Sequence, residues 1–467
     1  MIGGIFFSCF CLRNSVPLCL ETLQKMIGKS PNQNEGELFR PLLKDFIDMN
    51  HELALLADRI DWSYFEKEFA PLYSNTGCPA MPIRFMVGCM MLKHMYNLGD
   101  ETLAEAWVMN PYLQYFTGAA FFEHRFPCDP SDFVHFRKRI GEAGFQKIFE
   151  YSVKMFGRKA EESLVVSDTT VQGNNTTFPT DARLYKKVID SCNKIAHTEN
   201  IPQRQTYTKT SKELLRMTYN SEHPKRHKKA VAAMRKLHTI AGRQVRELER
   251  VMTEEQRKVY EEELIIYNRV LSQTRHSKDK VYSIHKPQTA CIAKGKASHM
   301  YEFGQKVGMI LTAKSQIIVA IKAFDGNPHD SKTVEPLLKQ MASENQKLPE
   351  TLAYDRGGRG AKEIMGVKVI TPGKPRKSDT AYDRMKKRYP FRRRAGIEPV
   401  FGHLKTDHRM HDNFLSGRES ASINAMLAAT GWNLKKMMKD LAKKSAKTLC
   451  VLLRILFEGP QYKLQTA

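Results

Sequence analysis

Two aspartates and one glutamate stand where the sequence could support phosphoryl chemistry. Asp168 closes the apolar run Ser163-Leu-Val-Val-Ser-Asp168, and Asp355 closes Thr351-Leu-Ala-Tyr-Asp355. Each run suits a buried strand. Carboxylates at the ends of neighbouring strands lie close together, and a divalent cation usually relieves their repulsion. Glu398 is a third acid, so the three residues predict a site for Mg²⁺, which keeps positions open for phosphate oxygens.

Two cations flank Glu398 in the sequence. Arg394 precedes it by four residues and Lys405 follows it by seven, a spacing that puts all three on one face of a continuous helix. Pro399 disfavours the α conformation at Glu398, so the helix is expected to begin near Pro399 or to kink there. A carboxylate for a metal, beside cations for phosphate oxygens, indicates phosphodiester chemistry.

Each of these residues also has a plain structural interpretation. An aspartate at a strand end commonly forms a turn or a cap, and Glu398 alone is more often a surface partner of Arg394. The turn Gly357-Gly-Arg-Gly360 lacks the Gly-Lys-Ser/Thr ending of a P-loop. It is expected to lead from a strand into a short helix, or to bring backbone N–H groups close to a phosphate. The two aspartates, Glu398 and its flanking cations together indicate a metal-dependent phosphodiester site more strongly than any one of these residues does alone.

The charge of the chain points to a polyanionic partner. The 467 residues include 74 Lys and Arg against 50 Asp and Glu, a formal net charge of +24. Such a protein attracts nucleic acid, although a ribosome-associated protein is an alternative on charge alone. The excess is uneven. Residues 181–240 hold 14 basic and 5 acidic side chains, and residues 371–410 hold 12 and 4.

Several classes of protein are excluded. The 9 cysteines include no Cys-x-x-Cys pair, which argues against a zinc ribbon or a redox motif and fits reduced thiols in the cytoplasm. No run of 18 apolar residues indicates a membrane span. Hydrophobic residues make up 42% of the chain, as in a globular protein.

The pattern along the chain divides it into four parts. Residues 1–35 are expected to be a loose or misassigned tail. Residues 36–160 are predicted to be helical and to bind DNA, either as a helix-turn-helix around Leu98-Gly-Asp100 or as a plain bundle. Residues 161–415 mix strands and helices, with a helical insertion at 183–280 whose part 225–277 is predicted to be an antiparallel hairpin. Residues 416–467 are predicted to be helical, with an amphipathic helix over about 419–443.

Four segments resemble the bacterial insertion-sequence transposases of the DDE class, close to the insertion-sequence-five group. They are Val165-Val-Ser-Asp168-Thr-Thr-Val-Gln172 with Phe178-Pro-Thr-Asp181, Tyr301-Glu-Phe-Gly-Gln-Lys306, Ala353-Tyr-Asp355-Arg-Gly-Gly-Arg-Gly360, and Arg392-Arg-Arg-Ala-Gly-Ile-Glu398-Pro-Val-Phe-Gly-His-Leu-Lys405. The family shows Tyr-x2-Arg-x3-Glu-x6-Lys around its third acid. Arg394, Glu398 and Lys405 fill the last three positions, and Phe391 replaces the tyrosine.

The resemblance implies a ribonuclease-H-like mixed sheet, with Asp168 on the first strand, Asp355 after the fourth and Glu398 on a late helix. It implies that Asp168, Asp355 and Glu398 are catalytic and hold two Mg²⁺ ions, for which Mn²⁺ can substitute, and that Arg394 and Lys405 bind DNA. The N-terminal domain would bind the terminal inverted repeats of the element.

The partners implied are the transposon ends and target DNA, both double-stranded, with a homodimer on DNA in the bacterial cytoplasm, associated with the nucleoid. Two alternatives stay open: a catalytically silent DNA-binding protein derived from a transposase, and a stand-alone Mg²⁺-dependent nuclease.

Overall fold

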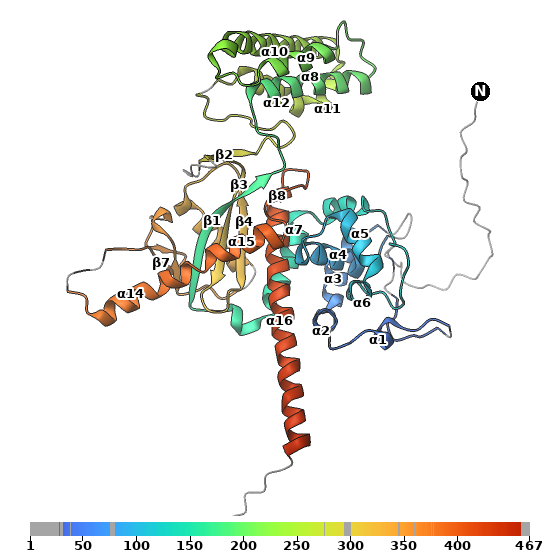
Figure 1. Cartoon of the computed structure of the whole chain (residues 1–467), viewed down its shortest axis with the longest axis vertical. Helices are drawn as coiled ribbons and strands as arrows, with labels where there is room; N and C mark the ends of the chain where they lie inside the picture. Colours follow the sequence, from blue (N-terminus) through green and yellow to red (C-terminus); the bar gives the residue numbers. More distant parts are fainter. Residues whose placement is uncertain are drawn as a thin grey trace, which may run out of the picture.

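The computed structural model describes residues 28, 31–37, 39–74, 80–274, 276–293, 300–343, 346–358, 360–374, 376 and 378–458, with backbone alone over 444–458. Most of the tail predicted at 1–35 lies outside these ranges. Within them, the chain combines a helical N-terminal region with a mixed α/β part (Figure 1). No helix in the described ranges has the length and apolar character needed to cross a membrane.

The N-terminal region is built from short helices that pack around one buried helix. They are α1 (Leu43–Phe46), α2 (Glu52–Arg59), α3 (Trp62–Phe69), α4 (Ile83–Met95), α5 (Asp100–Met109), α6 (Pro111–Phe116) and α7 (Asp132–Lys154). α7 begins directly after Asp129-Pro-Ser131, a sequence typical of a helix start. Gly141 interrupts α7 with φ of 59°, a conformation that glycine adopts readily.

A mixed sheet forms the centre of the molecule. Its strands are β1 (Leu164–Asn174), β2 (Ala290–Ala293), β3 (Tyr301–Thr312), β4 (Ile318–Phe324), β5 (Thr351–Ala353), β6 (Glu363–Ile364), β7 (Val367–Ile370) and β8 (Asp412–Asn413). The order is β2-β3-β1-β5-β7-β6, with β4 also pairing β3 and β8 pairing β1. β3 runs antiparallel to β1 and β4, whereas β5 is parallel to β1 and to β7.

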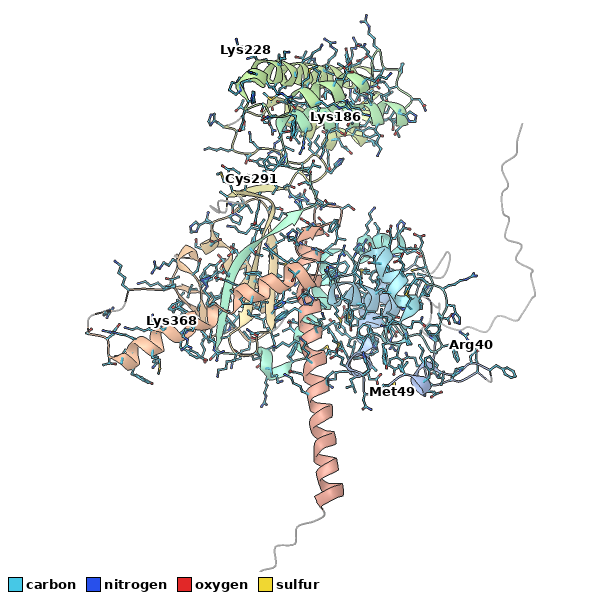
Figure 2. All side chains as sticks on the ribbon, in the orientation of Figure 1. Arg40, Met49, Lys186, Lys228, Cys291 and Lys368 are labelled. Atoms are coloured by element: carbon cyan, nitrogen blue, oxygen red, sulfur yellow. The ribbon has the colours of Figure 1, made fainter. Side chains whose placement is uncertain are left out.

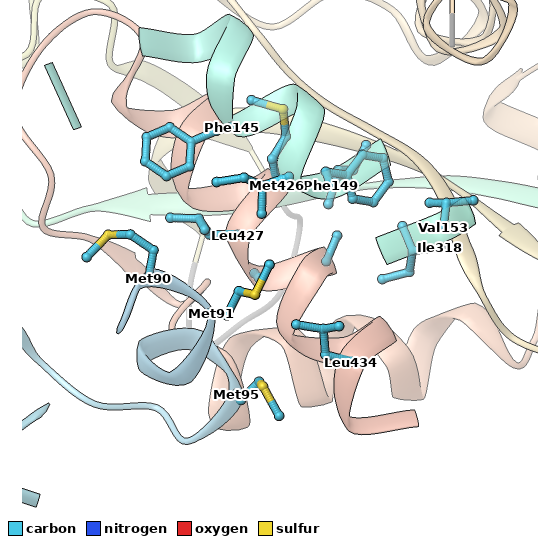
Figure 3. Packing of buried hydrophobic residues seen from close by; sticks show 14 of the residues in the cluster. Met90, Met91, Met95, Phe145, Phe149, Val153, Ile318, Met426, Leu427 and Leu434 are labelled. Carbon is cyan, nitrogen blue, oxygen red and sulfur yellow. The ribbon is translucent and has the colours of Figure 1, made fainter. Parts of the chain in front are cut away.

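Four further helices surround the sheet: α13 (Val334–Ser343), α14 (Ala381–Arg394), α15 (Ile397–Asp407) and α16 (Ser420–Glu458). α16 joins the two halves of the molecule. Figure 3 shows Leu427 and Leu434 of α16 between the methionines of α4 and the side chains of Phe149 and Ile318. The buried apolar residues of the N-terminal helices, the sheet and α16 therefore form one continuous core.

The insertion after β1 has a separate core. It consists of α8 (Asp181–Thr198), α9 (Thr208–Met217), α10 (Pro224–Val251), α11 (Glu254–Val259) and α12 (Glu261–Ser272). The helices stand apart from the sheet (Figure 1). Thr253 and Gln256 form a capping box at the start of α11. The predicted hairpin at 225–277 is instead three helices, because α11 separates α10 from α12.

Three predictions about the elements need correction. β1 does not end at Asp168, because pairing with β3 continues to Gly173 and β1 to Asn174. The turn after Asp355 leads into the 3₁₀ helix η4 (Arg356–Gly358) and the β6–β7 hairpin, not into an α-helix, in the residues that the structure describes there. α16 runs beyond residue 443, to Glu458.

Candidate functional site

The sheet brings Asp168 and Asp355 together. β1 and β5 are parallel neighbours in which Val166 pairs with Ala353. β5 ends at Ala353, and Asp168 and Asp355 each lie two residues beyond this pair. The two carboxyl groups are close enough for the charge of Asp355 to act on Asp168.

Arg394 connects Asp168 to Glu398. Its Nη2 lies 3.0 Å from Asp168 Oδ2 and 3.4 Å from Glu398 Oε1. These two carboxylate oxygens are therefore at most 6.4 Å apart, the sum of the two distances. The Asp168 and Arg394 side chains are 17% and 18% exposed, whereas Glu398 is 70% exposed. The ion pair suggested by the plain interpretation of Glu398 is present, but Arg394 also holds Asp168.

The helix break expected near Pro399 is confirmed, so Arg394 is not on one continuous helix with Glu398 and Lys405. α14 ends at Arg394, and α15 begins at Ile397 after the turn Ala395-Gly396. Pro399 lies in the first turn of α15, where a missing N–H leaves no helical bond unmade. Glu398 and Lys405 do share a face of α15, about 10.5 Å apart along the axis.

The pKa of the Asp168 carboxyl is raised above its ordinary value. Burial is the main cause, and the nearby charges of Asp355 and Asp330 act in the same direction. The Thr169 backbone N–H, which donates to Asp168 Oδ1 at 2.8 Å, and the Arg394 guanidinium oppose the shift. Asp168 is therefore a carboxylate whose charge is only partly compensated by the protein.

The donor set suits a hard divalent cation. Asp168, Asp355 and Glu398 offer only carboxylate oxygens, the ligands that Mg²⁺ and Mn²⁺ prefer. In the part of the chain that the structure describes, no three His, Cys, Asp or Glu side chains are gathered closely enough to hold an ion. The Arg394 guanidinium instead bridges Asp168 and Glu398. The carboxylates are therefore suitable ligands for the metal. The Arg394 guanidinium occupies the space between Asp168 and Glu398 where a metal ion bound by both would lie.

Cations are dense beside these acids. None of the residues of α14 is buried, and its exposed cations are Arg384, Lys386, Lys387, Arg388, Arg392 and Arg393. α14 projects from the sheet (Figure 1). A second basic surface lies on the insertion, where Lys225, Arg226, Lys228 and Lys229 are exposed at the start of α10 and Lys228 is on its outer side (Figure 2). Phe391, at the tyrosine position of the signature, is partly buried against the core.

The N-terminal helices fit the bundle better than a helix-turn-helix reader. Almost all of α4 is buried, and α5, which follows the Gly99 turn, exposes Glu101 and Glu105, charges that repel DNA. A basic cavity of about 910 Å³ lies between this region and the loop before α16. Its charged lining residues are Lys93, Asp100, Glu101, Arg137, Lys138, Arg409, Arg418 and Glu419.

Sequence reasoning missed the support behind the site. Asp330 accepts hydrogen bonds from Thr169 Oγ1 at 3.0 Å and from Lys306 Nζ at 2.9 Å. Lys306 ends one of the four segments quoted above, but that segment carried no predicted role. Thr169 directly follows Asp168. The polar Thr169 beside Asp168 was the one sequence signal that could have indicated a supporting hydrogen bond at this position.

Comparisons with known proteins agree with this geometry. A family model described as Transposase domain (DUF772) matches residues 41–139, and one described as Transposase DDE domain matches residues 270–434. The second range contains Asp355, Arg394, Glu398 and Lys405. A Rhizobium meliloti protein described as Uncharacterized protein ORF8 in nfe locus is 40% identical over 187 residues, which are 39% of this chain and 90% of that protein. No solved structure matches the chain.

Proposed function

The chain belongs to the insertion-sequence DDE transposases, and from this premise we propose that it binds the terminal inverted repeats of its element and performs Mg²⁺-dependent cleavage and strand transfer. Members of this family are enzymes that cleave DNA and join strands. The observation that carries the proposal is the proximity of the three acids: Asp355 follows β5, the parallel neighbour of β1, and its charge acts on Asp168, while Arg394 contacts both Asp168 and Glu398.

We assign the catalytic part a ribonuclease-H-like fold. The support is the strand order, in which β4, β3 and β1 are antiparallel neighbours and β5 and β7 continue the sheet in parallel. If the short β2 is set aside, Asp168 is on the first strand and Asp355 follows the fourth, as the resemblance implies. Relationship to the insertion-sequence-five group is part of the same proposal, supported by the signature residues Arg394, Glu398 and Lys405.

Asp168, Asp355 and Glu398 would hold two Mg²⁺ ions. The bound metal supplies the Lewis acid that activates water and stabilises the leaving 3′ oxygen. The protein's part is to hold the three carboxylates together beside the central strands β1 and β5. Arg394 would release Asp168 and Glu398 to the metal and turn its guanidinium, a bidentate partner for phosphate, to the DNA backbone.

DNA would approach along α14 and the face of α15 that carries Lys405. Exposed cations on α14 lead to Arg394, and such a row attracts the negatively charged phosphate backbone. The terminal repeat would bind residues 36–160 through exposed cations such as Lys138 on α7, and not through α5, whose exposed charges are acidic. Two ends must be paired before joining, so we propose a homodimer on DNA, and hence association with the nucleoid.

The test is strand transfer with the native element ends, the full-length protein and Mg²⁺, with EDTA as control. Cleaved ends joined to a target, and lost with EDTA, are expected. Hydrolysis without joining would indicate the stand-alone nuclease. Lys405→Ala should weaken the positioning of the DNA end more than metal binding, and unchanged cleavage by this variant would remove Lys405 from the site.

A further inference from the structure

Asp330 contacts β1, which carries Asp168, as well as β3 and the turn that follows Asp355. It opens the short 3₁₀ helix η3 (Asp330–Lys332), between β4 and α13. Its Oδ1 accepts from Thr169 Oγ1 of β1 at 3.0 Å and from Lys306 Nζ of β3 at 2.9 Å. Lys306 is 11% exposed and also donates to the Pro328 carbonyl at 2.7 Å. One carboxylate oxygen thus joins two strands to the connection that precedes α13.

The second oxygen of Asp330 faces the turn that follows Asp355. A Cβ placed on Gly357 would lie 3.0 Å from Asp330 Oδ2 and 3.1 Å from Asp355 Oδ1. The two oxygens are therefore no more than 6.1 Å apart. A side chain at this position would press on both carboxylates, so the absence of one allows η4 to pack closely against Asp330.

Asp330 approaches from the opposite side of the sheet to Arg394. In the β1–β3 ladder, Thr169 pairs with Gly308 and Val171 with Lys306, so the Thr169 and Lys306 side chains share one face. Asp168, one residue earlier, belongs to the other face, where it contacts Arg394. Asp330 therefore supports the acids from behind and leaves the front of the site to metal and DNA.

We propose that Asp330 is a positioning residue that sets the separation between Asp168 and Asp355; this inference rests on the proposed function. Through Thr169, whose N–H holds Asp168 Oδ1, it fixes one carboxylate. Through the Gly357 turn it fixes the other. Loss of such an outer partner typically lowers metal affinity or activity 10- to 100-fold.

Positioning can be separated from a simple charge effect. If Asp330 only added negative charge, removing the nearby cation Lys306 would strengthen the binding of a divalent cation. If Lys306 holds Asp330 in place, Lys306→Met weakens that binding, in the same direction as Asp330→Ala. Gly357→Ala gives a third, independent perturbation, because its methyl group displaces the two carboxylates without changing any charge.

The experiment titrates the full-length protein with Mn²⁺ alone, followed by electron paramagnetic resonance, and then measures the Mg²⁺ dependence of cleavage. We expect Asp330→Ala to weaken Mn²⁺ binding roughly 10-fold or more, and Asp330→Asn less, since the amide still accepts from Thr169. The half-saturating Mg²⁺ concentration should rise in parallel, and high Mg²⁺ should restore much of the rate. Asp325→Asn, at a 66% exposed position near the end of β4, is the matched control.

Three results would overturn the inference: Mn²⁺ affinity of Asp330→Ala within twofold of wild type, tighter binding by Lys306→Met, or an equal loss in Asp325→Asn. If wild type cleaves and binds Mn²⁺ normally, these results overturn the role of Asp330 alone. A wild-type protein that binds no Mn²⁺ overturns both this role and the proposed metal-dependent function. A folded Asp330→Ala protein, shown by its thermal melting, excludes simple unfolding as the cause of weaker binding.

Discussion

The Arg394 guanidinium lies 3.0 Å from the Asp168 carboxylate, although 226 residues separate them in the sequence. Both side chains are largely buried, so the pair is only weakly screened by solvent. The same nitrogen reaches Glu398 at 3.4 Å. Asp168 and Glu398, which lie on different elements, thus share the Arg394 cation. The same contact holds the C-terminal end of α14 against the central strand β1.

Replacement of Arg394 tests whether it takes part in catalysis. Arg394→Ala should lower the single-turnover cleavage rate at saturating DNA by at least about 100-fold, as loss of a preorganised charge at a reacting phosphate typically does. Arg394→Lys should be intermediate, because an ammonium lacks the bidentate fork. Arg393→Ala removes the same charge from the neighbouring exposed position and should weaken DNA binding without changing that rate. Equal rates in both alanine variants would contradict the role of Arg394.

The three acids should be separable from DNA binding. Asp168→Asn, Asp355→Asn and Glu398→Gln each remove a ligand charge with little change of shape, so each is expected to abolish cleavage while the dissociation constant for the element ends stays within a few fold. Gel-shift and cleavage assays on the same preparations measure both. A variant that still cleaves and joins ends would remove that residue from the mechanism.

Much of this site could be predicted because its signals are local. The apolar runs that precede Asp168 and Asp355 correspond to the first part of β1 and to β5. Both acids at 168 and 355 were found because each follows a buried apolar run. The continuation of β1 past Asp168 was missed, since Thr169–Gly173 looks polar and is ordered by its partner strand β3.

Other features depend on contacts between distant segments, which spacing does not encode. Pro399 indicated a helix break near Glu398, but only the fold shows that the end of α14 brings Arg394 to Asp168. The role of Asp330 depends on Thr169 and Lys306, which come from two strands. The burial of α4 is also tertiary: its residues are apolar on nearly all sides, and only packing against α16 and α3 shows how they are covered.

Two buried histidines should make the fold sensitive to acid. Burial lowers the pKa of His94 to about 3 and that of His408 to about 4, and His408 Nδ1 contacts the His94 carbonyl at 2.7 Å. The folded-state pKa values lie below 6.5, so the stabilisation is present above pH 6.5 and is lost as pH falls toward the folded values. Each histidine should reduce the unfolding free energy by about 1.4 kcal/mol per pH unit below about 6.

Urea denaturation between pH 7 and 5 measures this slope. His94→Gln should remove about half of the histidine contribution to the pH dependence of the unfolding free energy. This expectation does not depend on how the substitution changes stability at pH 7. His135→Asn, at an exposed position on α7, is the control and should leave the slope unchanged. A wild-type stability that is flat from pH 7 to pH 5 would contradict the prediction.

Asp100 neutralises two buried cations where α5 meets α4 and α7. It lies 2.5 Å from Lys93 Nζ and 2.9 Å from Arg137 Nη2, whose side chains are only 5% and 10% exposed. Asp100→Asn would leave both charges poorly compensated, and we expect a loss of about 3 kcal/mol in the unfolding free energy at pH 7. Glu101→Gln, the next residue and exposed, should change it by less than about 0.5 kcal/mol. Equal effects of the two substitutions would show that the buried pairs contribute nothing.

Salt dependence can decide which basic segment contacts DNA. The logarithm of the binding constant should fall with the logarithm of salt concentration by about 0.9 for each phosphate neutralised. If α14 lies on DNA, the double substitution Arg388→Ala with Arg392→Ala should make the slope shallower by nearly 2 units. Lys228→Ala with Lys229→Ala tests the insertion in the same way.

The matched control is Lys339→Ala on α13, whose charge is 64% exposed and paired with Glu335 at 2.6 Å. It should not alter the slope, because α13 lies on the face of the sheet behind the acids. If the α14 and insertion variants keep the wild-type slope, neither surface neutralises phosphate, and the excess charge of residues 181–240 and 371–410 serves another purpose. A change confined to the α14 variant would place the DNA beside Arg394 and leave the insertion free of it.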